Sequence, residues 1–368
     1  MLKGHYRVAI EVYMQNKKIS TKYITVDPSH PEPGPLEEGG SVLRRGGLVA
    51  FPTETVYGLG ANALDGRAVA GIFEAKGRPQ DNPLIVHVAG REAVSGLVKK
   101  ITGAAEALMD AFWPGPLTII LSVGEVVPAQ VTAGLDTVAV RMPDHPVALG
   151  LIRAAGVPVA APSANTSGRP SPTTARHVLN DLGGRIDLII DGGPAGVGVE
   201  STVVDLTAPA PLVLRPGGVT LEDLSEVLES VAVDPAARSG SKGRCRPRSP
   251  GMKYTHYAPR APLFLIEGEV KAVAAKIMDL AREYRAQGRR VGVLSYNDKG
   301  DFSAAGEVVL AGRRDKPETV AAALYAALRR FDEMEVDVIL AEGLTEQGIG
   351  LAVMNRLRKA AGGKIIRV

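Results

Sequence analysis

One stretch of this chain separates two regions that each contain enough apolar sequence to form a core. Residues 234–250 read DPAARSGSKGRCRPRSP, with five basic residues and no apolar periodicity. A segment of that composition cannot bury a face against a sheet and is typical of a linker. The chain has 368 residues, which is longer than one domain usually is. We therefore expect one domain over residues 1–233, a linker over 234–260 and a second domain over 261–368.

The region after the linker alternates between strand and helix patterns. Strands separated by helices form parallel sheets, because each crossover needs a long connection. No G-x-G-x-x-G motif opens the first helix, so this fold alone assigns no cofactor. We expect a small, Rossmann-like parallel α/β domain of about five strands. Its predicted strands are 261–268, 289–296, 306–312, 336–343 and 364–368, and its predicted helices are 270–288, 318–334 and 351–360.

The region before the linker is less regular and predicts a mixed α/β domain. Its apolar runs are short and are separated by many turns rich in glycine and proline. Ala68, Val69, Ile72 and Phe73 have helical spacing, and Gly77 can end that helix in a left-handed C-cap. The predicted strands are 7–13, 22–26, 47–52, 84–88, 117–122, 137–142, 157–161, 186–191, 201–206 and 212–215, and the predicted helices are 35–45, 65–75, 91–112, 144–155, 173–182 and 221–230.

Four of these strands end in a residue that is followed by proline: LVAFPTET, AVRMPD, VAAPSAN and LVLRPGG. Proline cannot donate to a sheet ladder and keeps the preceding residue extended, so each strand stops sharply and turns out polar side chains. Ligands of open α/β sheets bind at strand ends, which favours one shared cleft. The alternative is that proline only ends each strand. The side chains delivered in this way are Thr53, Glu54, Thr55, Arg141, Ser163, Asn165 and Arg215.

Two further segments carry groups that suit anions. KGRPQDNPLIVHV, residues 76–88, places Lys76 and Arg78 beside two prolines at the end of a predicted helix. SANTSGRPSPT, residues 163–173, supplies hydroxyls ahead of another helix, where they can hold phosphate oxygens or act as ordinary N-caps. The glycine-rich segment 191–202 lacks the GK[ST] of a P-loop. Fixed arginines and hydroxyls without a nucleophile–base pair favour binding and orienting of anions over covalent catalysis.

The composition excludes several other classes of protein. A single cysteine, Cys245, rules out an internal disulfide and a cysteine-based zinc site and suits a reducing cytoplasm. No apolar run is long enough to span a membrane, and the N-terminus does not have the pattern of a signal peptide. The net charge of +3 permits an anionic ligand without requiring nucleic acid.

Taken in order, these motifs resemble those of the YrdC-like family. The resemblance rests on PTETVYGLG, KGRPQDNPLIVHV, SANTSGRPSPT, ESTVVDL and LRPGG, and it covers residues 46–368. The two-domain layout and SPGMKYTHYAP, residues 249–259, are similar to the longer branch, the L-threonylcarbamoyl-AMP synthases. The resemblance implies a twisted mixed-sheet domain with a concave basic cleft, and then a Rossmann-like domain. Residues 1–13 would be an extension.

The resemblance also implies a reaction, in which L-threonine, bicarbonate and ATP give threonylcarbamoyl-AMP and pyrophosphate. It implies roles by motif position. Lys76 and Arg78 would be catalytic, and His87 has a second interpretation as an ordinary strand histidine. Thr55, His87, Arg141 and Ser201 would hold threonine. Arg78, Asn82, Thr137, Ala161, Ser163, Asn165, Ser171, Arg215, and Tyr257 or Tyr254 would hold ATP.

No protein metal site is expected, and Mg²⁺ would accompany ATP on its phosphates. The product would pass to cytoplasmic proteins that build threonylcarbamoyladenosine in tRNA, and the basic linker permits weak RNA binding. Two rivals remain at this stage. One is a module that binds double-stranded RNA or ribosomes without catalysis. The other is a hydrogenase-maturation type of carbamoyl transferase, against which the single cysteine argues.

SPGMKYTHYAP carries more amphipathic side chains than a spacer needs. We expect it to fold over the cleft as a lid that excludes water from hydrolysable intermediates. The alternative is that it only packs the linker onto one domain.

Overall fold

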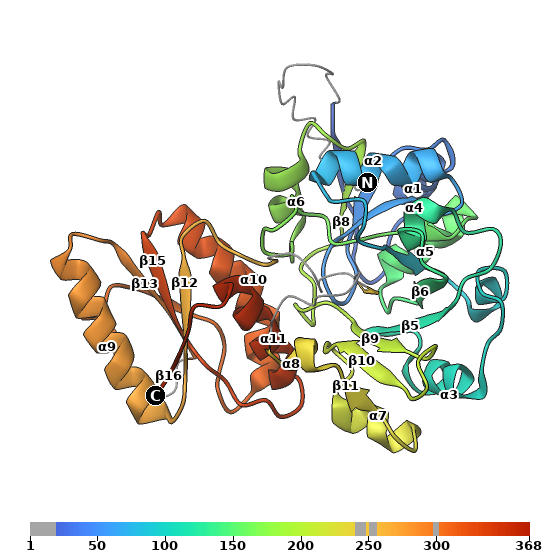
Figure 1. Cartoon of the computed structure of the whole chain (residues 1–368). Helices are drawn as coiled ribbons and strands as arrows, with labels where there is room; N and C mark the ends of the chain where they lie inside the picture. The colour runs from blue at the N-terminus through green and yellow to red at the C-terminus, as the bar shows by residue number, and fades with distance from the viewer. Residues whose placement is uncertain (1–19, 240–247, 250–255, 297–301) are drawn as a thin grey trace.

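A computed structural model of the chain describes residues 20–239, 248–249, 256–296 and 302–368. The expected strand at 7–13 and the proposed extension lie outside the described residues. Two α/β bodies lie side by side, with the C-terminal body on the left in Figure 1. The predicted fold class, a mixed-sheet domain followed by a smaller parallel α/β domain, is confirmed. None of the described helices is long and apolar enough to cross a membrane.

The first body is built on a large mixed sheet. Its described strands follow the order β1-β8-β2-β3-β7-β4-β6-β5-β9-β10-β11, with both parallel and antiparallel pairs. The strands are β1 (Lys22–Thr25), β2 (Val49–Phe51), β3 (Gly58–Asn62), β4 (Ile85–His87), β5 (Leu117–Ser122), β6 (Thr137–Arg141), β7 (Val159–Ala160), β8 (Leu188–Asp191), β9 (Thr202–Asp205), β10 (Leu212–Arg215) and β11 (Ala232–Val233).

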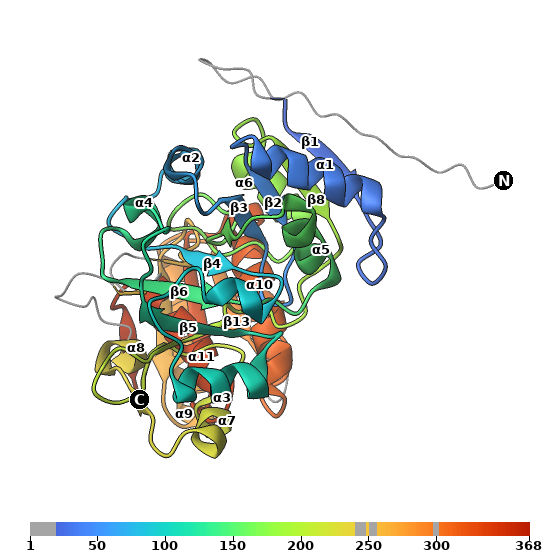
Figure 2. The same ribbon diagram turned by 90° about the vertical axis from the view of Figure 1, so that its right-hand side faces the viewer.

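Helices cover this sheet and bury its apolar residues in two main clusters. Helices α1 and α5 pack against each other over the β2 and β8 region, as Figure 2 shows, and α2 packs on β3. The helices are α1 (Pro33–Arg44), α2 (Gly66–Lys76), α3 (Gly103–Phe112), α4 (Ala129–Thr132), α5 (Pro146–Ala155), α6 (Ala175–Leu182), α7 (Leu221–Val227) and α8 (Pro235–Ser239), with a 3₁₀ turn at Arg91–Val94.

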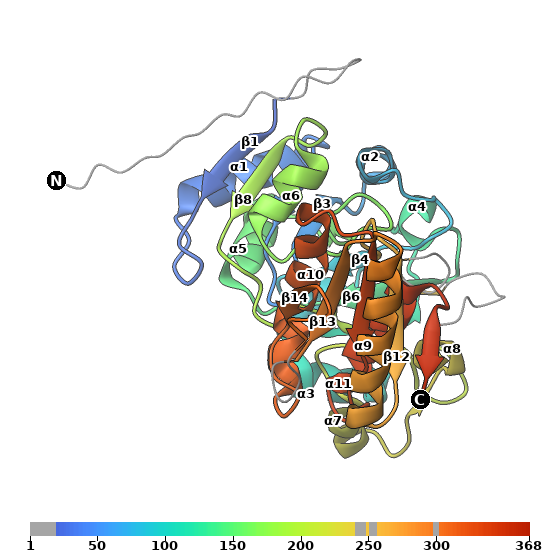
Figure 3. The same cartoon turned by 90° about the vertical axis from the view of Figure 1, so that its left-hand side faces the viewer.

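The second body contains a parallel sheet in the order β14-β13-β15-β12-β16. Helix α9 covers one face and lies in front of the sheet in Figure 3. Helices α10 and α11 lie on the other face, between the sheet and the first body (Figure 1). The elements are β12 (Leu263–Glu267), α9 (Val270–Ala286), β13 (Val291–Ser295), β14 (Glu307–Leu310), α10 (Pro317–Glu333), β15 (Val338–Glu342), α11 (Gly350–Ala361) and β16 (Ile365–Arg367).

Several elements differ from the sequence-based expectations, and α4 and β11 are among those that were not predicted. The helix predicted over 91–112 is a 3₁₀ turn and then α3, because Lys99 N donates to Ser122 O and ties the intervening chain to β5. Strand β3, GLGAN, was not expected because its residues have low strand propensity, and it is held by pairing with β2 and β7. The expected linker also contains the short helix α8. The C-cap expected at Gly77 is confirmed, with a φ of 59°.

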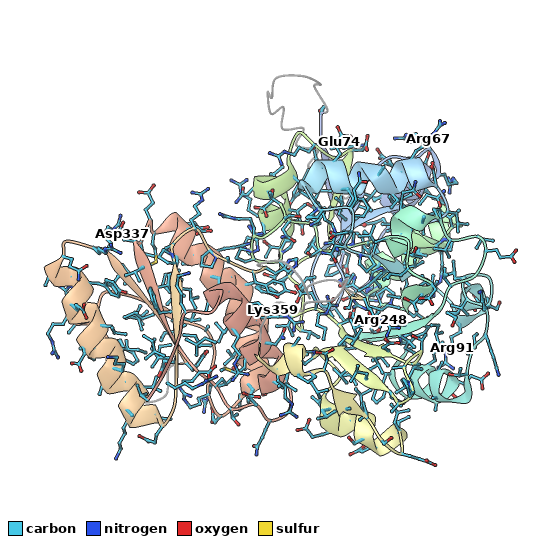
Figure 4. All side chains as sticks on the ribbon, viewed as in Figure 1. Arg67, Glu74, Arg91, Arg248, Asp337 and Lys359 are labelled. Carbon is cyan, nitrogen blue, oxygen red and sulfur yellow. The ribbon has the colours of Figure 1, made fainter. Side chains whose placement is uncertain are left out.

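The two bodies share one apolar cluster. It combines Val56 and Val199 of the first body with Tyr257 and with residues of α10 and α11 such as Leu324 and Leu357. Charged groups surround this cluster, and Figure 4 shows Lys359 of α11 where the two bodies meet. The interface is therefore continuous with the core of the second body rather than a loose contact between finished domains.

One glycine of the segment 191–202, Gly198, is required by the close approach of the two bodies. It has a φ of +78°, and a Cβ there would lie 2.4 Å from Ala321 O and from Ala322 Cα on α10. Only a residue without a side chain allows the backbones of the two bodies to approach so closely.

Gly198→Ala should therefore destabilise the protein by at least about 2 kcal/mol, through strain at positive φ and displacement of α10. Urea unfolding monitored by the fluorescence of the single tryptophan, Trp113, measures this. Gly71→Ala in α2 is the matched control, because its nearest contact would be Leu48 at 3.7 Å and helical alanine is favoured. Equal effects of the two substitutions would contradict the close-approach argument.

Candidate active site

The carboxyl-terminal ends of several strands of the large sheet surround one pocket. Its wall is built from the turn after β2 and the start of β3, the turn after α2, the strands β4, β6 and β10, the loops after β7 and before β9, and the segment 256–257. The lining contains four arginines and one carboxylate, so the pocket is electropositive. The lining residues are Thr53, Thr55, Val56, Gly58, Arg78, Ile85, His87, Arg141, Ala161, Pro162, Ser163, Asn165, Arg169, Ser171, Glu200, Ser201, Arg215, His256 and Tyr257.

Most of the site residues expected from sequence come together in this wall. Arg141, Ser163 and Arg215 lie at or just beyond the ends of strands that proline follows, as the proline pattern predicted, whereas Arg78 follows helix α2 and Ser201 precedes β9. Their roles in binding remain predictions. The expected residues that line the pocket are Thr55, Arg78, His87, Arg141, Ala161, Ser163, Asn165, Ser171, Ser201, Arg215 and Tyr257.

Lys76 does not line the pocket, and its predicted catalytic role stays a prediction. Its side chain is buried, and Nζ donates to the backbone carbonyls of Ser163 and Asn165. A buried ammonium requires acceptors, and the adjacent loop supplies them. Burial, with Arg78 nearby, lowers the pKa of Lys76 well below its usual value. In this structure Lys76 anchors the loop that presents Ser163 and Asn165.

Asn82 and Thr137 also lie outside the lining. The backbone carbonyls of Asn82 and Pro83 accept from Arg78 Nη2 at 3.3 Å and 3.1 Å, so this turn orients Arg78. Thr137 begins β6 whereas Arg141 ends it, about 13 Å away along the strand. Their predicted contacts with ATP stay predictions. Tyr254 lies outside the described residues, and so do most residues of the expected lid.

His87 and Arg141 are neighbours on paired strands, in register between β4 and β6. Burial, followed by the charge of Arg141, lowers the pKa of His87 to about 3, so the imidazole is neutral near pH 7. Its Nδ1 is buried and makes no hydrogen bond to another part of the chain that the structure describes. Arg141 is positioned by its Nε, which donates to Gly115 O at 3.3 Å, and by an ion pair with Glu54.

Ser201 and Arg215 form a second polar corner of the pocket. Arg215 donates through Nε to Ser201 O and through Nη2 to Ser201 Oγ, both at 3.0 Å. Ser201 Oγ also lies 2.8 Å from Thr118 Oγ1. These bonds hold a buried guanidinium in one orientation, which suits a fixed charge that must face an anion.

Glu200 links this pocket to the second body. It accepts from Ser171 Oγ at 2.5 Å, from Tyr325 Oη at 2.8 Å and from Arg356 Nε at 2.9 Å. Burial alone would raise the pKa of Glu200, but Arg356 and Arg215 with these hydrogen bonds outweigh it and lower the pKa to about 2. Helices α10 and α11 thus determine where Glu200 and Ser171 point.

Tyr257 has a backbone conformation that a tyrosine rarely adopts, with a φ of 65°. Its ring stacks on Tyr325 with centroids 5.3 Å apart, and the guanidinium of Arg356 lies 5.6 Å from its ring centroid. Ala258 N donates to Gly168 O at 2.9 Å. Such strain persists where surrounding contacts hold it, and it is common at functional sites.

Sequence reasoning missed three charged or titratable residues of the wall. Glu200 is the first residue of ESTVVDL, Arg169 lies inside SANTSGRPSPT, and His256 precedes Tyr257. Arg169 is paired with Asp332 of α10 at 2.7 Å, and burial lowers the pKa of His256 to about 3. Each lies within two residues of a chosen residue, and for Arg169 and Glu200 the local sequence gave no sign of the partner in a distant helix.

Two protein-family models match successive parts of the chain. A family model described as telomere recombination, the Sua5/YciO/YrdC domain, matches residues 41–217. A second model, described as the C-terminal domain of threonylcarbamoyl-AMP synthase, matches residues 219–362. Threonylcarbamoyl-AMP synthase of Bacillus subtilis is 53% identical over 333 residues, which cover 90% of this chain and 94% of the relative. The chain belongs to the threonylcarbamoyl-AMP synthase family.

Other relatives agree with this assignment. Threonylcarbamoyl-AMP synthase of Pyrococcus abyssi is 54% identical over 89% of this chain and 94% of the relative. The crystal structure of Pyrococcus abyssi Sua5 complexed with L-threonine aligns with a TM-score of 0.88 and 51% identity, over 94% of this chain and 99% of that one. The protein is therefore an enzyme of the nucleotidyl-transferring class, and these relatives do not support the alternative of a non-catalytic RNA-binding module.

The contacts of Glu200 yield a prediction for Arg356. Arg356→Met leaves the buried carboxylate of Glu200 without its closest cation, and removing one partner of a buried ion pair costs about 3 kcal/mol. We expect the free energy of unfolding, measured in urea, to fall by that amount. Arg330→Met is the matched control, because its pair with Glu333 on α10 is exposed and should contribute less than about 0.5 kcal/mol. Similar losses of unfolding free energy in both variants would show that the buried pair stabilises the protein no more than the exposed pair does.

Proposed function

We propose that this pocket binds L-threonine, bicarbonate and ATP together and converts them into threonylcarbamoyl-AMP and pyrophosphate. The observation that carries the proposal is the convergence of Arg78, Arg141 and Arg215 on one wall. All three reactants are anionic or carry a carboxylate, and arginine is always charged and matches carboxylates and phosphates bidentately. Hydroxyls of Thr55, Ser163 and other lining residues add neutral donors.

Arg141 is the group that we assign to the threonine carboxylate, with Thr55, His87 and Ser201 around the amino acid. Arg141, His87 and Thr55 belong to one end of the pocket, because β4 and β6 are paired and the turn after β2 faces them. His87 is neutral near pH 7, so it can accept or donate a hydrogen bond without adding a competing charge. Arg78, Ser163, Asn165, Ser171, Ala161, Arg215 and Tyr257 are the described lining residues that we assign to ATP.

The proposed chemistry has two bond-forming steps. The amine of threonine attacks the carbon of bicarbonate, and a carbamate forms as water leaves. A carbamate oxygen then attacks the α-phosphorus of ATP, and the bond from that phosphorus to the bridging oxygen breaks to release pyrophosphate. Arg78 and Asn165 stabilise the charge that moves onto pyrophosphate. Fixed donors of this kind act mainly through preorganised electrostatics.

Mg²⁺ would arrive on the phosphates of ATP and neutralise part of their charge. The carboxylate in the lining, Glu200, is bound by Arg356, Tyr325 and Ser171, so we assign the metal to the phosphates and not to this side chain. We further propose that the product passes to proteins that modify tRNA in the cytoplasm, where ATP and tRNA are both present. Any weak RNA binding by the basic linker would serve that transfer.

The activity itself is tested with purified protein, ATP, Mg²⁺, bicarbonate and each of the twenty amino acids. Pyrophosphate release should require bicarbonate and should be greatest with L-threonine, and the nucleotide product should have the mass of threonylcarbamoyl-AMP. Release that does not depend on both threonine and bicarbonate would overturn the proposal. Salt-sensitive RNA binding without turnover would instead favour the RNA-binding alternative.

Arg78→Ala should lower the rate of pyrophosphate release at least about 10²-fold, because it removes a guanidinium aimed at developing phosphate charge. Arg78→Lys should restore only part of the rate, since an ammonium cannot reproduce the bidentate geometry. Arg67→Ala, at the exposed start of α2, is the control with unchanged turnover. Near-normal turnover of Arg78→Ala would mean that this arginine does not act on the nucleotide.

A further inference from the structure

Glu54 is a nearly buried carboxylate that no step above uses. It follows the short strand β2 and Pro52, and its side chain is 13% exposed. It does not line the pocket, although its neighbours Thr53 and Thr55 do. A carboxylate in such a position requires a partner, and the identity of the partner indicates what the carboxylate is for.

The turn that carries Glu54 is rigid. Thr53 Oγ1 accepts from the backbone N–H groups of Thr55 and Val56 at 3.2 Å and 3.3 Å, and donates to Val56 O at 2.7 Å. On the other side, Glu54 O accepts from Val197 N at 2.7 Å. The backbone of Glu54 is therefore held from two directions without any contribution from its carboxylate.

That carboxylate is paired with Arg141. Glu54 Oε1 lies 2.6 Å from Arg141 Nη2, and neither oxygen of Glu54 makes a hydrogen bond elsewhere in the described part of the chain. Strands β2 and β6 are separated in the sheet by β3, β7 and β4. In a flat sheet four strand spacings would amount to about 19 Å, so the contact spans the concavity of the sheet.

The pair leaves one end of the guanidinium for a ligand. Arg141 Nε is occupied by Gly115 O and Nη2 by Glu54, while the side chain lines the pocket. The other titratable groups near this pair are His87 on β4 and His145 before α5, and burial lowers the pKa of both imidazoles. Neither histidine is therefore a second cation near pH 7 that would compete with Arg141 for the carboxylate of Glu54.

We infer that Glu54 is a positioning residue, which aims Arg141 at the carboxylate of threonine without touching the substrate itself. The inference rests on the proposed function, because it takes the ligand of Arg141 from that proposal. Removing the charge of Glu54 leaves Arg141 in place but free to rotate toward the neighbouring carbonyl or away from the pocket. Threonine binding should then weaken selectively, while the nucleotide end of the pocket keeps its own arginines.

Glu54→Gln tests this in the full-length enzyme by steady-state pyrophosphate release. We expect the KM for L-threonine to rise about 10-fold, while the KM for ATP and the kcat each change less than about 2-fold. Glu54→Asp keeps the charge on a shorter side chain and should raise the KM for threonine less than Glu54→Gln does. Glu38→Gln, in the more exposed pair with Lys22, is the matched control and should leave all three constants unchanged.

The double variant Glu54→Gln/Arg141→Lys separates positioning from a structural role. If Glu54 acts through Arg141, adding Glu54→Gln to Arg141→Lys should raise the KM for threonine little beyond the value of Arg141→Lys alone. Equal rises in the KM for threonine and ATP, an unchanged KM for threonine, or a fall in that KM would overturn the inference. If Glu54→Gln does not fold, Glu54→Asp alone decides between these outcomes. A wild-type enzyme without threonine-dependent release would refute the proposed function instead.

Discussion

The buried ion pair between Glu200 and Arg356 is the interaction on which the arrangement of this enzyme depends. Glu200 belongs to the wall of the pocket, and Arg356 belongs to α11 of the second body. Both are desolvated, and each would be costly to bury without the other. The pair therefore couples the position of the C-terminal body to the shape of the pocket, and Tyr325 and Ser171 extend that coupling on either side.

The curvature of the large sheet is the second constraint. Strand ends that lie several positions apart in the sheet deliver side chains to one pocket only because the sheet is strongly twisted and concave. The ion pair of Glu54 with Arg141 and the clustering of Arg78 with Arg215 both depend on this curvature. Proline after a strand then ends the ladder and turns a polar group toward the pocket.

Much of this could be predicted because it is local. Apolar periodicity identified most strands and the helices of the second body, since burial on one face imposes a period of two or 3.6 residues. Strand-end prolines identified Arg141, Ser163 and Arg215 as pocket residues. Strand β3 is not predicted from sequence because its glycines and alanine have little strand preference, and only pairing with β2 and β7 makes it a strand.

The sequence by itself determined the division into two α/β bodies, the family, and the set of polar groups at the strand ends, because each of these is written in short contiguous motifs. Only the tertiary structure decided which of those groups face the pocket. The ammonium of Lys76 donates to the carbonyls of a neighbouring loop, and Glu200 pairs with Arg356, which is 156 residues away in the chain. A buried charge is satisfied by whichever group folding brings within hydrogen-bonding distance, and no local pattern records that choice.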